Sequence, residues 1–371
     1  MTVHDRQTRV SHAVNHGLFS GPAIHFERAV SELRYGRPVL LRDGATATAI
    51  MALDAASPDQ FNRMADAAEG RHDLFLSGQR AVRMDVASSS GILLPLSGVG
   101  HDAAVRLAYR RGATLPGTWR PAPALMRAAS DLTDSALLLP ALVCAAPTAA
   151  FAGCAEISVE DLRRTASART QFEIVARTPV PLRDLGMCDF VVFRGGLAQR
   201  DQVAIVVGTP DLSKPVPVRI HSSCITGDLA GSLKCDCGDQ LQGGLAALKE
   251  AGGGVLIYLD QEGRGTGLRA KMRAYALQHD GLDTLDADAE LGFHDDHRRY
   301  EAASAMLRAM GIASVDLHTN NPTKVAALQK DGIDVASRKG VPARITSENL
   351  NYLRTKSLRA GHIIDYLPVG G

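Results

Sequence analysis

From Pro217 onward, short apolar runs alternate with segments that carry an apolar residue every three or four positions, and this alternation constrains the fold most. A short apolar run is typical of a buried strand, and the longer spacing is typical of a helix. The pattern predicts strands at 218–221, 255–259 and 315–318, and helices at 239–251, 268–280, 297–310 and from Pro322 onward. Strands and helices in alternation predict an α/β domain, a sheet covered by helices.

The chain before Pro217 has two parts. Within residues 166–215, the runs FEIVART, CDFVVFRG and QVAIVVG are separated by proline and glycine, which predicts antiparallel strands leading into the later sheet. Within residues 1–165, FERAVSELRYGRPVLL predicts a helix, a glycine turn and a strand, and ILLPL is a further apolar run. We therefore predict two domains, an N-terminal α/β domain over 1–165 and a C-terminal mixed-sheet α/β domain with flanking helices over 166–371.

The composition narrows the classes of protein to consider. Hydrophobic residues make up 45% of the chain and charged residues 22%, which is enough for a sizeable core. Because 41 basic residues face 40 acidic ones, we expect no nucleic-acid or membrane partner. The opening MTVHDRQTRV lacks the apolar centre of an export signal, and the uncharged run 135–155 contains two prolines, which favours a buried helix and loop over a membrane span. We expect a cytoplasmic protein.

Three of the six cysteines form a cluster. Cys224, Cys235 and Cys237 have the spacing Cys-x10-Cys-x-Cys and follow a predicted strand. Three thiolates bind zinc well: a catalytic site keeps the fourth tetrahedral position for water, whereas a structural site fills it with a protein ligand. His221 is the nearest candidate for such a ligand. The spacing leaves three interpretations open, namely catalytic zinc, structural zinc and three ordinary buried cysteines.

Polar residues gather where other predicted strands end. They are the segment before Cys224, the turn QEGRGTG (261–267), the segment HDDHR (294–298), and Thr319 with Lys324. Each segment alone is equally well explained as a strand end, a turn or a solvated helix start. Together they lie where α/β proteins bind ligands, and their glycines and helix N-termini favour anions. They predict a phosphorylated substrate attacked by metal-activated water.

These segments resemble GTP cyclohydrolase II. The matching stretches occur in that family's order from about Arg219 to Ile364: RIHSSCITGDLAGSLKCDCGDQL, LDQEGRGTGLRAKMRAYALQ, LGFHDDHRRY, TNNPTKV and NYLRTKSLRAGHII. The resemblance implies zinc-dependent hydrolysis of GTP to 2,5-diamino-6-hydroxy-4-(5-phosphoribosylamino)pyrimidine, formate and pyrophosphate, the first step of riboflavin biosynthesis. It also implies Mg²⁺ bound to the triphosphate, and a homodimer.

The resemblance assigns roles to individual residues. It implies Cys224, Cys235 and Cys237 as zinc ligands, Asp296 as proton acceptor and Tyr275 as a helper in ring opening. It implies that Arg298 attacks the α-phosphate, although a protonated guanidinium is a poor nucleophile and Arg298 could instead only stabilise phosphate charge. The implied GTP contacts are Arg219, Ile220, His221, Ser222, Ser223, Gln240, Glu262, Gly263, Arg264, Thr284, Thr319 and Lys324.

Two places depart from the family pattern. Ser223 stands where the family often has glutamate, which shortens a side chain that could orient the base or the metal; we infer no loss of activity from it. In the N-terminal half, FERAVSELRYGRPVLL resembles the opening of dihydroxybutanone phosphate synthase. That enzyme then needs several acidic residues, and the stretch RDGATATAIM offers only Asp43. We expect a degenerate domain that lacks synthase activity and supports assembly or regulation.

Two other functions compete with a complete cyclohydrolase. One is a paralogue that stops at a formamidopyrimidine or serves another pathway, and the other is a catalytically dead nucleotide-binding regulator. The presence of Tyr275 favours complete ring opening, and the presence of Asp296, Arg298 and all three cysteines argues against a dead protein. A zinc-based nucleic-acid binder is disfavoured because no basic stripe accompanies the cysteines.

Overall fold

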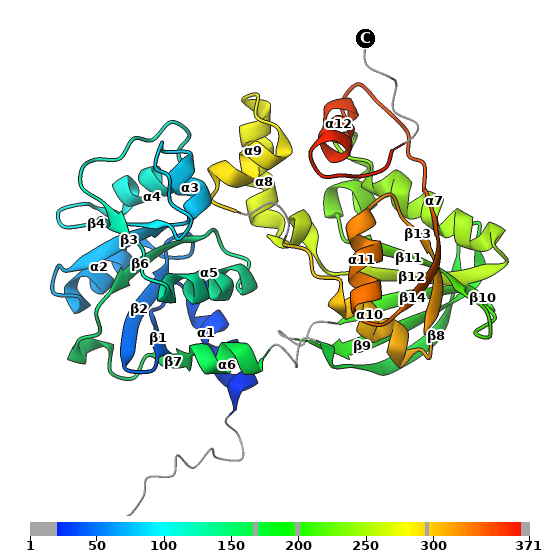
Figure 1. Ribbon diagram of the computed structural model, residues 1–371, viewed down its shortest axis with the longest axis horizontal. Helices are drawn as coiled ribbons and strands as arrows, with labels where there is room; N and C mark the ends of the chain where they lie inside the picture. The colour runs from blue at the N-terminus through cyan, green and yellow to red at the C-terminus, as the bar shows by residue number, and fades with distance from the viewer. Residues whose placement is uncertain (1–20, 166–169, 197–200, 294–296, 365–371) are drawn as a thin grey trace, which may run out of the picture.

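The computed structural model describes residues 21–165, 170–196, 201–293 and 297–364, and these build two mixed sheets of seven strands each (Figure 1). The first sheet has the strand order β5-β4-β3-β6-β2-β1-β7, and the second has the order β14-β13-β11-β12-β10-β9-β8. Helices flank both sheets (Figure 1). The predicted α/β class with a mixed C-terminal sheet is confirmed.

The first sheet is formed by residues 39–158. Its strands are β1 (Val39–Asp43), β2 (Thr46–Ala52), β3 (His72–Leu76), β4 (Ile92–Pro95), β5 (Arg120–Pro121), β6 (Ala141–Ala145) and β7 (Ala155–Ser158). Its helices are α1 (Pro22–Arg34), α2 (Pro58–Ala67), α3 (Gly78–Val82), α4 (His101–Tyr109), α5 (Leu125–Ser135) and α6 (Val159–Arg164). The predicted order of helix, glycine turn and strand is present in α1, Gly36 and β1.

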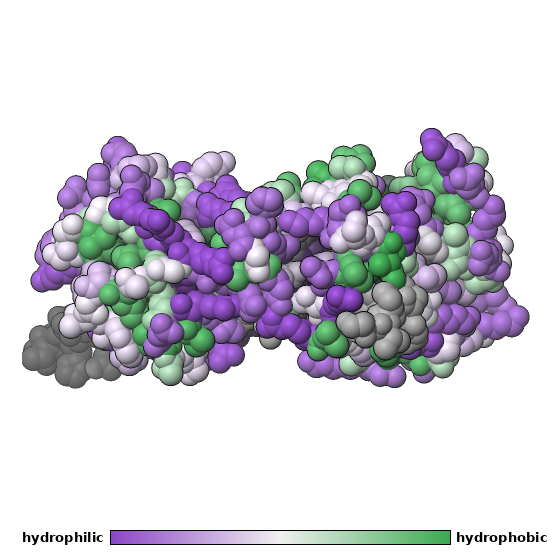
Figure 2. Space-filling model, turned by 90° about the horizontal axis from the view of Figure 1, so that it is seen from above, coloured by the Kyte–Doolittle hydropathy of each residue, from purple (hydrophilic) through white to green (hydrophobic). Residues whose placement is uncertain are grey.

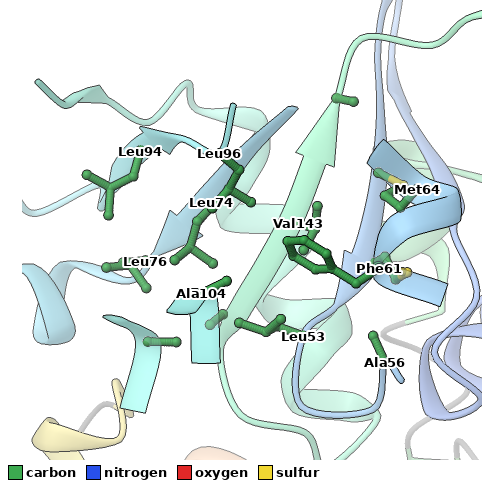
Figure 3. Close-up of a cluster of buried hydrophobic side chains, with 14 of the residues drawn as sticks. Leu53, Ala56, Phe61, Met64, Leu74, Leu76, Leu94, Leu96, Ala104 and Val143 are labelled. Atoms are coloured by element: carbon green, nitrogen blue, oxygen red, sulfur yellow. The ribbon is translucent and has the colours of Figure 1, made fainter. Parts of the chain in front are cut away.

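The core of this domain is built mainly from apolar side chains. Side chains from the strands and from α2 and α4 point toward one another in Figure 3, among them Leu53, Phe61, Leu74 and Val143. None of these four is more than 1% exposed. Burial of this kind contributes most of the stability of such a domain, because apolar surface leaves water.

The uncharged run 135–155 corrects one expectation. We predicted a buried helix and loop there, but Ala141–Ala145 is strand β6, between β3 and β2 in the middle of the sheet. All five of its residues are buried. A strand that is covered on both faces lacks polar alternation, so its sequence resembles that of a buried helix. A short 3-10 turn, Ala149–Phe151, follows it.

The second sheet is formed by residues 172–339. Its strands are β8 (Phe172–Leu182), β9 (Gly186–Gly195), β10 (Gln202–Gly208), β11 (Val216–Ser222), β12 (Gly253–Leu259), β13 (Ser314–His318) and β14 (Asp334–Lys339). Strands β8, β9 and β10 pair antiparallel, as predicted, whereas β11 pairs parallel with both β12 and β13. Its helices are α7 (Cys237–Glu250), α8 (Leu268–His279), α9 (Thr284–Glu290), α10 (Glu301–Ala309), α11 (Pro322–Lys330) and α12 (Leu350–Leu358).

The helix predicted at 297–310 begins later than expected. Helix α10 starts at Glu301, and residues 297–300 are not helical. The backbone N–H of His297 donates to the carbonyl of Arg264 at 3.3 Å, so this stretch packs along the turn after β12 instead of continuing the helix. The non-helical stretch carries Arg298 toward the strand ends.

Residues 268–293, which we call the α8–α9 arm, extend from the second domain onto the first (Figure 1). Leu139 of the first domain packs in one apolar cluster with side chains of the arm: Ala270, Ala274, Ala287, Leu291 and Phe293. Arg80 forms a buried ion pair with Glu290, and the Ser77 hydroxyl donates to the carbonyl of Gly292 at 2.6 Å. The arm is therefore packed between the two sheets.

Seen from above, the surface of the molecule is mostly hydrophilic, with hydrophobic residues scattered in small areas (Figure 2). None of the described helices has the length and the apolar character that crossing a bilayer requires.

Candidate active site

Three loops meet at one edge of the second sheet. Strand β11 lies between β12 and β13 and runs parallel to both, so the carboxyl ends of the three strands are adjacent. Cys224 follows β11, Gln261 follows β12, and Thr319 follows β13. Ligands of α/β proteins commonly bind at such an edge. The structure thus brings together three segments, of which consecutive ones are about forty and sixty residues apart in the sequence.

The three clustered cysteines are arranged to share one ion. Their sulfur atoms all lie within 4.8 Å of one another, and Cys224 Sγ is 3.8 Å from Cys235 Sγ. Ligands about 2.3 Å from a tetrahedral ion are about 3.8 Å apart, so the spacing fits a thiolate-bound metal. The thiols form no disulfide, and among the described residues no histidine or carboxylate joins the group. The three cysteines can hold a metal ion and leave one tetrahedral position open.

His221 is directed elsewhere. Its Nε2 lies 3.1 Å from both carboxylate oxygens of Asp228, and its ring stacks on Tyr258 at 5.6 Å. Burial lowers the pKa of His221, which favours the neutral ring. Asp228 also accepts from the backbone N–H of Cys224 at 3.0 Å. His221 therefore helps to hold the cysteine loop, and the alternative in which it serves as a fourth ligand has no support in this geometry.

The backbone passes very close to the sulfur atoms at Gly227. This residue lies in a single π-type turn, Ile225–Leu229, directly after Cys224. A Cβ at this position would lie 3.0 Å from Cys235 Sγ and 3.2 Å from Cys224 Sγ. Only glycine fits such a close approach without displacing the cysteines. On the other side Cys237 begins α7, and a helix N-terminus favours thiolates.

Lys271 of α8 supplies a positive charge beside the thiols. Its Nζ lies 3.1 Å from Cys224 Sγ and 2.7 Å from Glu262 Oε1. Burial lowers the pKa of Lys271, but its hydrogen bonds to Glu262 and Cys224 raise the pKa by more. The net pKa lies above the ordinary value of lysine, so the ammonium stays charged. The hydrogen bonds that Cys235 and Cys237 make to Cys224 lower the pKa of that thiol. The same hydrogen bonds to Cys224 raise the pKa of Cys235 and Cys237, so the negative charge of the group is favoured on Cys224.

A cavity beside the cysteines is lined by residues predicted to contact GTP and by Tyr275, the predicted helper in ring opening. Glu262, Gly263, Arg264, Tyr275 and Thr284 line it together with Ser223 and the three cysteines. Burial raises the pKa of Tyr275 to about 12, so its hydroxyl stays protonated and can donate a hydrogen bond.

The turn after β12 is conformationally strained at this cavity. Gly263 and Arg264 both have positive φ, 62° and 60°. That conformation is unfavourable for arginine, by roughly 1 kcal/mol or more. Arg264 is held by an ion pair with Asp288 of the α8–α9 arm, 3.0 Å long. The strained backbone conformation therefore falls on Arg264, a residue predicted to bind the substrate.

A second cavity, the phosphate cavity, lies on the β13 side of the cysteines. Arg219, His221, Ser222, Gln240, Thr319 and Lys324 line it. The Arg219 guanidinium donates to Gln240 Oε1 at 2.8 Å and to the carbonyl of His318 at 2.9 Å. Lys324 Nζ donates to the carbonyl of Ile220 at 2.7 Å, whereas the Ile220 side chain belongs to the apolar core. Two nearly buried cations thus face a small polar cavity, which suits an anion.

The two cavities share four lining residues, Ser222, Cys237, Arg298 and Tyr352. A molecule that reaches from the thiols to Lys324 must pass this junction. Arg298 is therefore placed between the predicted base site and the predicted phosphate site. Asp296, the predicted proton acceptor, lies outside the described residues.

Comparisons with known proteins identify the family of the chain. A sequence model of GTP cyclohydrolase II matches residues 173–340. A protein of Xylella fastidiosa (strain 9a5c) named GTP cyclohydrolase-2 is 54% identical over 362 residues, covering 96% of this chain and 91% of that protein. The chain belongs to the GTP cyclohydrolase II family. It is therefore an enzyme of the hydrolase class.

Other comparisons concern parts of the chain. A GTP cyclohydrolase-2 of Pseudomonas paraeruginosa (strain DSM 24068 / PA7) is 43% identical over 199 residues, which cover 54% of this chain and 96% of that protein. A two-domain 3,4-dihydroxy-2-butanone 4-phosphate synthase from A. baumannii, solved by crystallography, aligns over 86% of this chain and 99% of its own. Its TM-score of 0.30 and identity of 15% are too low to assign the N-terminal domain.

Several residues of the site escaped the sequence reasoning. They are Asp228, Asp236, Lys271, Asp288, Tyr352 and Lys356, none of which lies in a recognisable ligand spacing. Lys271 could have been found, because it lies four residues before Tyr275 and so shares its helix face. Tyr352 and Lys356 could not, because nothing local places α12 over the strand ends.

Proposed function

We propose that this member of the GTP cyclohydrolase II family opens the guanine ring of GTP, with Zn²⁺ bound by Cys224, Cys235 and Cys237. The products are 2,5-diamino-6-hydroxy-4-(5-phosphoribosylamino)pyrimidine, formate and pyrophosphate, which makes the reaction the entry to riboflavin biosynthesis. The observation that carries the proposal is the 3.8 Å sulfur spacing in a group of three thiols beside a cation-lined cavity.

The phosphate cavity binds the triphosphate in this proposal. Arg219 and Lys324 are 6% and 7% exposed and offer charged donors, and Thr319 at the end of β13 adds a hydroxyl. Mg²⁺ would accompany the phosphates. Arg298 at the junction contacts the α-phosphate, where a water molecule cleaves the bond to the β-phosphate and releases pyrophosphate. Its charge stabilises the phosphate in that step, because a guanidinium stays protonated.

The cavity beside the cysteines binds guanine with C8 toward the thiols. A bound zinc ion would supply activation of water for attack on C8. Addition of one water opens the five-membered ring to a formamide, and a second water releases formate and leaves a free amine. Tyr275 donates from its neutral hydroxyl as the ring opens. Glu262 and Arg264 hold the base, and Lys271 keeps Glu262 oriented at 2.7 Å.

The decisive experiment is incubation of the full chain with GTP, Mg²⁺ and Zn²⁺, with products identified by mass spectrometry. We expect formate, pyrophosphate and the diaminopyrimidine in equal amounts. Protein stripped of metal by a chelator should leave the ring intact and recover when zinc is restored. Unchanged GTP would overturn the proposal, and an accumulated formamidopyrimidine would replace it with the shorter reaction.

We further propose that the N-terminal half has no synthase activity and supports the α8–α9 arm. Asp43 ends β1 and is the only acidic residue of RDGATATAIM, whereas the synthase that this half resembles needs a run of acidic residues there. Adding ribulose phosphate should yield no dihydroxybutanone phosphate. We propose a homodimer as well, for which light scattering should give twice the mass of the chain.

A further inference from the structure

The C-terminal helix lies over the strand-end edge of the second sheet, where the two cavities are (Figure 1). Tyr352 and Lys356 of α12, and His362 from the turn after it, line the phosphate cavity together with Arg219 and Lys324. None of these three residues was part of the expected site. They come from the far end of the chain, about a hundred and thirty residues after the cysteine cluster.

The turn after α12 is fixed to the sheet by its backbone. The N–H of Ile363 donates to the carbonyl of Asn320 at 2.9 Å, next to Thr319 at the end of β13. The N–H of His362 closes the helix on the carbonyl of Lys356 at 3.0 Å. Just before the helix, Asn349 Oδ1 accepts from the N–H of Thr346 at 2.9 Å and fixes the turn that leads into α12. These bonds hold the side chains of α12 against the cavity.

Lys356 is tied to the cysteine cluster by one carboxylate. Its Nζ lies 2.8 Å from Asp236 Oδ1, and Asp236 is 2% exposed and lies between Cys235 and Cys237. The same ammonium lies 4.8 Å above the Tyr352 ring. An ammonium has three N–H donors, and Asp236 takes only one of them. The others can serve an anion in the cavity.

Positive charge outweighs negative charge around this cavity. Of the described residues that line it, Arg219, Arg298, Lys324 and Lys356 are cations and Asp236 alone is a carboxylate. The excess of positive charge also affects His362. Burial, together with the charges of Lys356, Arg298 and Lys324, lowers the pKa of His362 to about 3, so its ring is neutral. Four cations that converge on one small space create a strong field for a polyanion.

We propose that Lys356 binds the polyphosphate tail of the substrate and that α12, through Lys356 and Tyr352, completes the phosphate site. This deepens the proposed function and rests on it for the identity of the substrate. Lys356 lines the phosphate cavity and not the cavity beside the cysteines, where the base is proposed to bind. Its part is to hold the phosphates, with Tyr352 filling the junction through which the ribose and the α-phosphate pass.

The test uses inorganic pyrophosphate as the probe, titrated into the full chain by calorimetry. We expect Lys356→Ala to bind pyrophosphate about tenfold more weakly, which is about 1.4 kcal/mol. The reason is the loss of a charge-assisted hydrogen bond. Lys356→Arg should keep most of the affinity, because it keeps the charge. The matched control is Arg354→Ala, an exposed cation on the same helix, which should leave the affinity unchanged.

Two further variants separate phosphate binding from a structural role. Lys356→Gln removes the charge but keeps a long polar side chain, so it serves if the alanine variant folds poorly. Lys356→Ala combined with Asp236→Asn removes the pair together. Persistent weak binding in the double variant supports the proposal, whereas restored binding means that Lys356 only neutralises Asp236 and overturns it. Unchanged affinity in folded Lys356→Ala also overturns it.

Turnover of GTP separates this inference from the proposed function. A wild-type chain that binds pyrophosphate through Lys356 but releases no formate contradicts the proposed function and leaves the phosphate site standing. If the wild-type chain releases formate but Lys356→Ala binds pyrophosphate as tightly as wild type, the proposed function stands and the phosphate site at Lys356 is contradicted. If both hold, Lys356→Ala should raise the KM for GTP about tenfold and change kcat little, because the interaction is equal in the ground and transition states.

Discussion

The two domains each have a sheet of seven strands, but they differ in how many polar side chains they bury. In the first domain the described polar residues that are buried are few: His72, Ser77, Arg80, Thr133 and Thr165. In the second they are many, and they include Arg219, His221, Asp236, Gln240, Thr319 and Lys324 around the strand ends. Burying polar groups is costly unless they find partners, so a domain that buries many of them in one place holds a site there.

The exceptions in the first domain point the same way. Ser77 and Arg80 contact the α8–α9 arm, and so does Asp54, whose side chain is 1% exposed. The arm carries Lys271 and Tyr275 on the side that faces the cysteines. Three buried polar groups of the first domain, Asp54, Ser77 and Arg80, therefore contact the part of the second domain that completes the active site. Variants of the first domain should therefore act mainly through stability and the position of the arm, and variants of the second domain mainly through chemistry and metal binding.

The largest effect should come from the cysteine cluster. Cys235→Ser replaces one of the three sulfur ligands and should lower formate release more than about a hundredfold. Mutating a residue that only hydrogen-bonds to a metal ligand already lowers metal affinity or activity about 10- to 100-fold, and loss of a ligand itself should cost more. The measurement is formate released from GTP, with zinc content determined in parallel. Cys154→Ser, in the first domain and away from the group, should behave as wild type. Equal activity in both variants would remove the metal from the mechanism.

The second effect should appear as lost stability. Arg80→Met leaves Glu290 buried without a partner, because the Arg80 and Glu290 side chains are only 2% and 7% exposed. Breaking such a pair costs roughly 3–5 kcal/mol. In urea, the first domain and the arm should separate or unfold at a lower concentration of urea than in the wild type. The double variant Arg80→Met/Glu290→Met should recover most of the loss, and failure to recover would mean that the pair is not what holds the arm.

Much of the second domain could be predicted because its features are local. Runs of adjacent residues predict the strands at 218–221, 255–259 and 315–318 and the helix that starts at Pro322. The structure contains all four elements. The cysteine spacing likewise brings three thiols into one short stretch of chain. Where burial masks the pattern, prediction failed: β6 is apolar on both faces, and its sequence indicated a helix.

What could not be predicted depends on contacts between distant segments. His297–Tyr300 follow a helical pattern, but they pack on the turn after β12, and only the folded chain shows this. The partnership of Asp54 with Arg269 and Arg273 joins residues more than two hundred positions apart. Lys356 meets Asp236 across 120 positions. Charged residues at such separations look like ordinary solvated surface in the sequence.

The third effect should appear in metal affinity. Lys271→Met removes the ammonium that lies 3.1 Å from Cys224 Sγ and should weaken zinc binding about 10- to 100-fold, the usual effect of losing a partner of a metal ligand. Competition with a chromophoric chelator measures this without turnover. Lys330→Met, exposed on α11, is the control. Unchanged zinc affinity would show that Lys271 serves only Glu262.

The smallest effect should be that of Asp54, and it tests the comparison most finely. Asp54 pairs with Arg273 at 2.8 Å and with Arg269 at 3.4 Å, and these arginines are 41% and 58% exposed on α8. Pairs with exposed partners contribute about 1 kcal/mol or less, so Asp54→Asn should barely change the free energy of unfolding. It should still lower kcat several-fold, because small displacements of catalytic side chains are costly and Lys271 and Tyr275 lie on the same helix. Asp59→Asn, which breaks an exposed pair with Arg63 in the same domain, should change neither quantity. If Asp54→Asn matches Asp59→Asn in turnover, the first domain holds the arm in place without adjusting the active site.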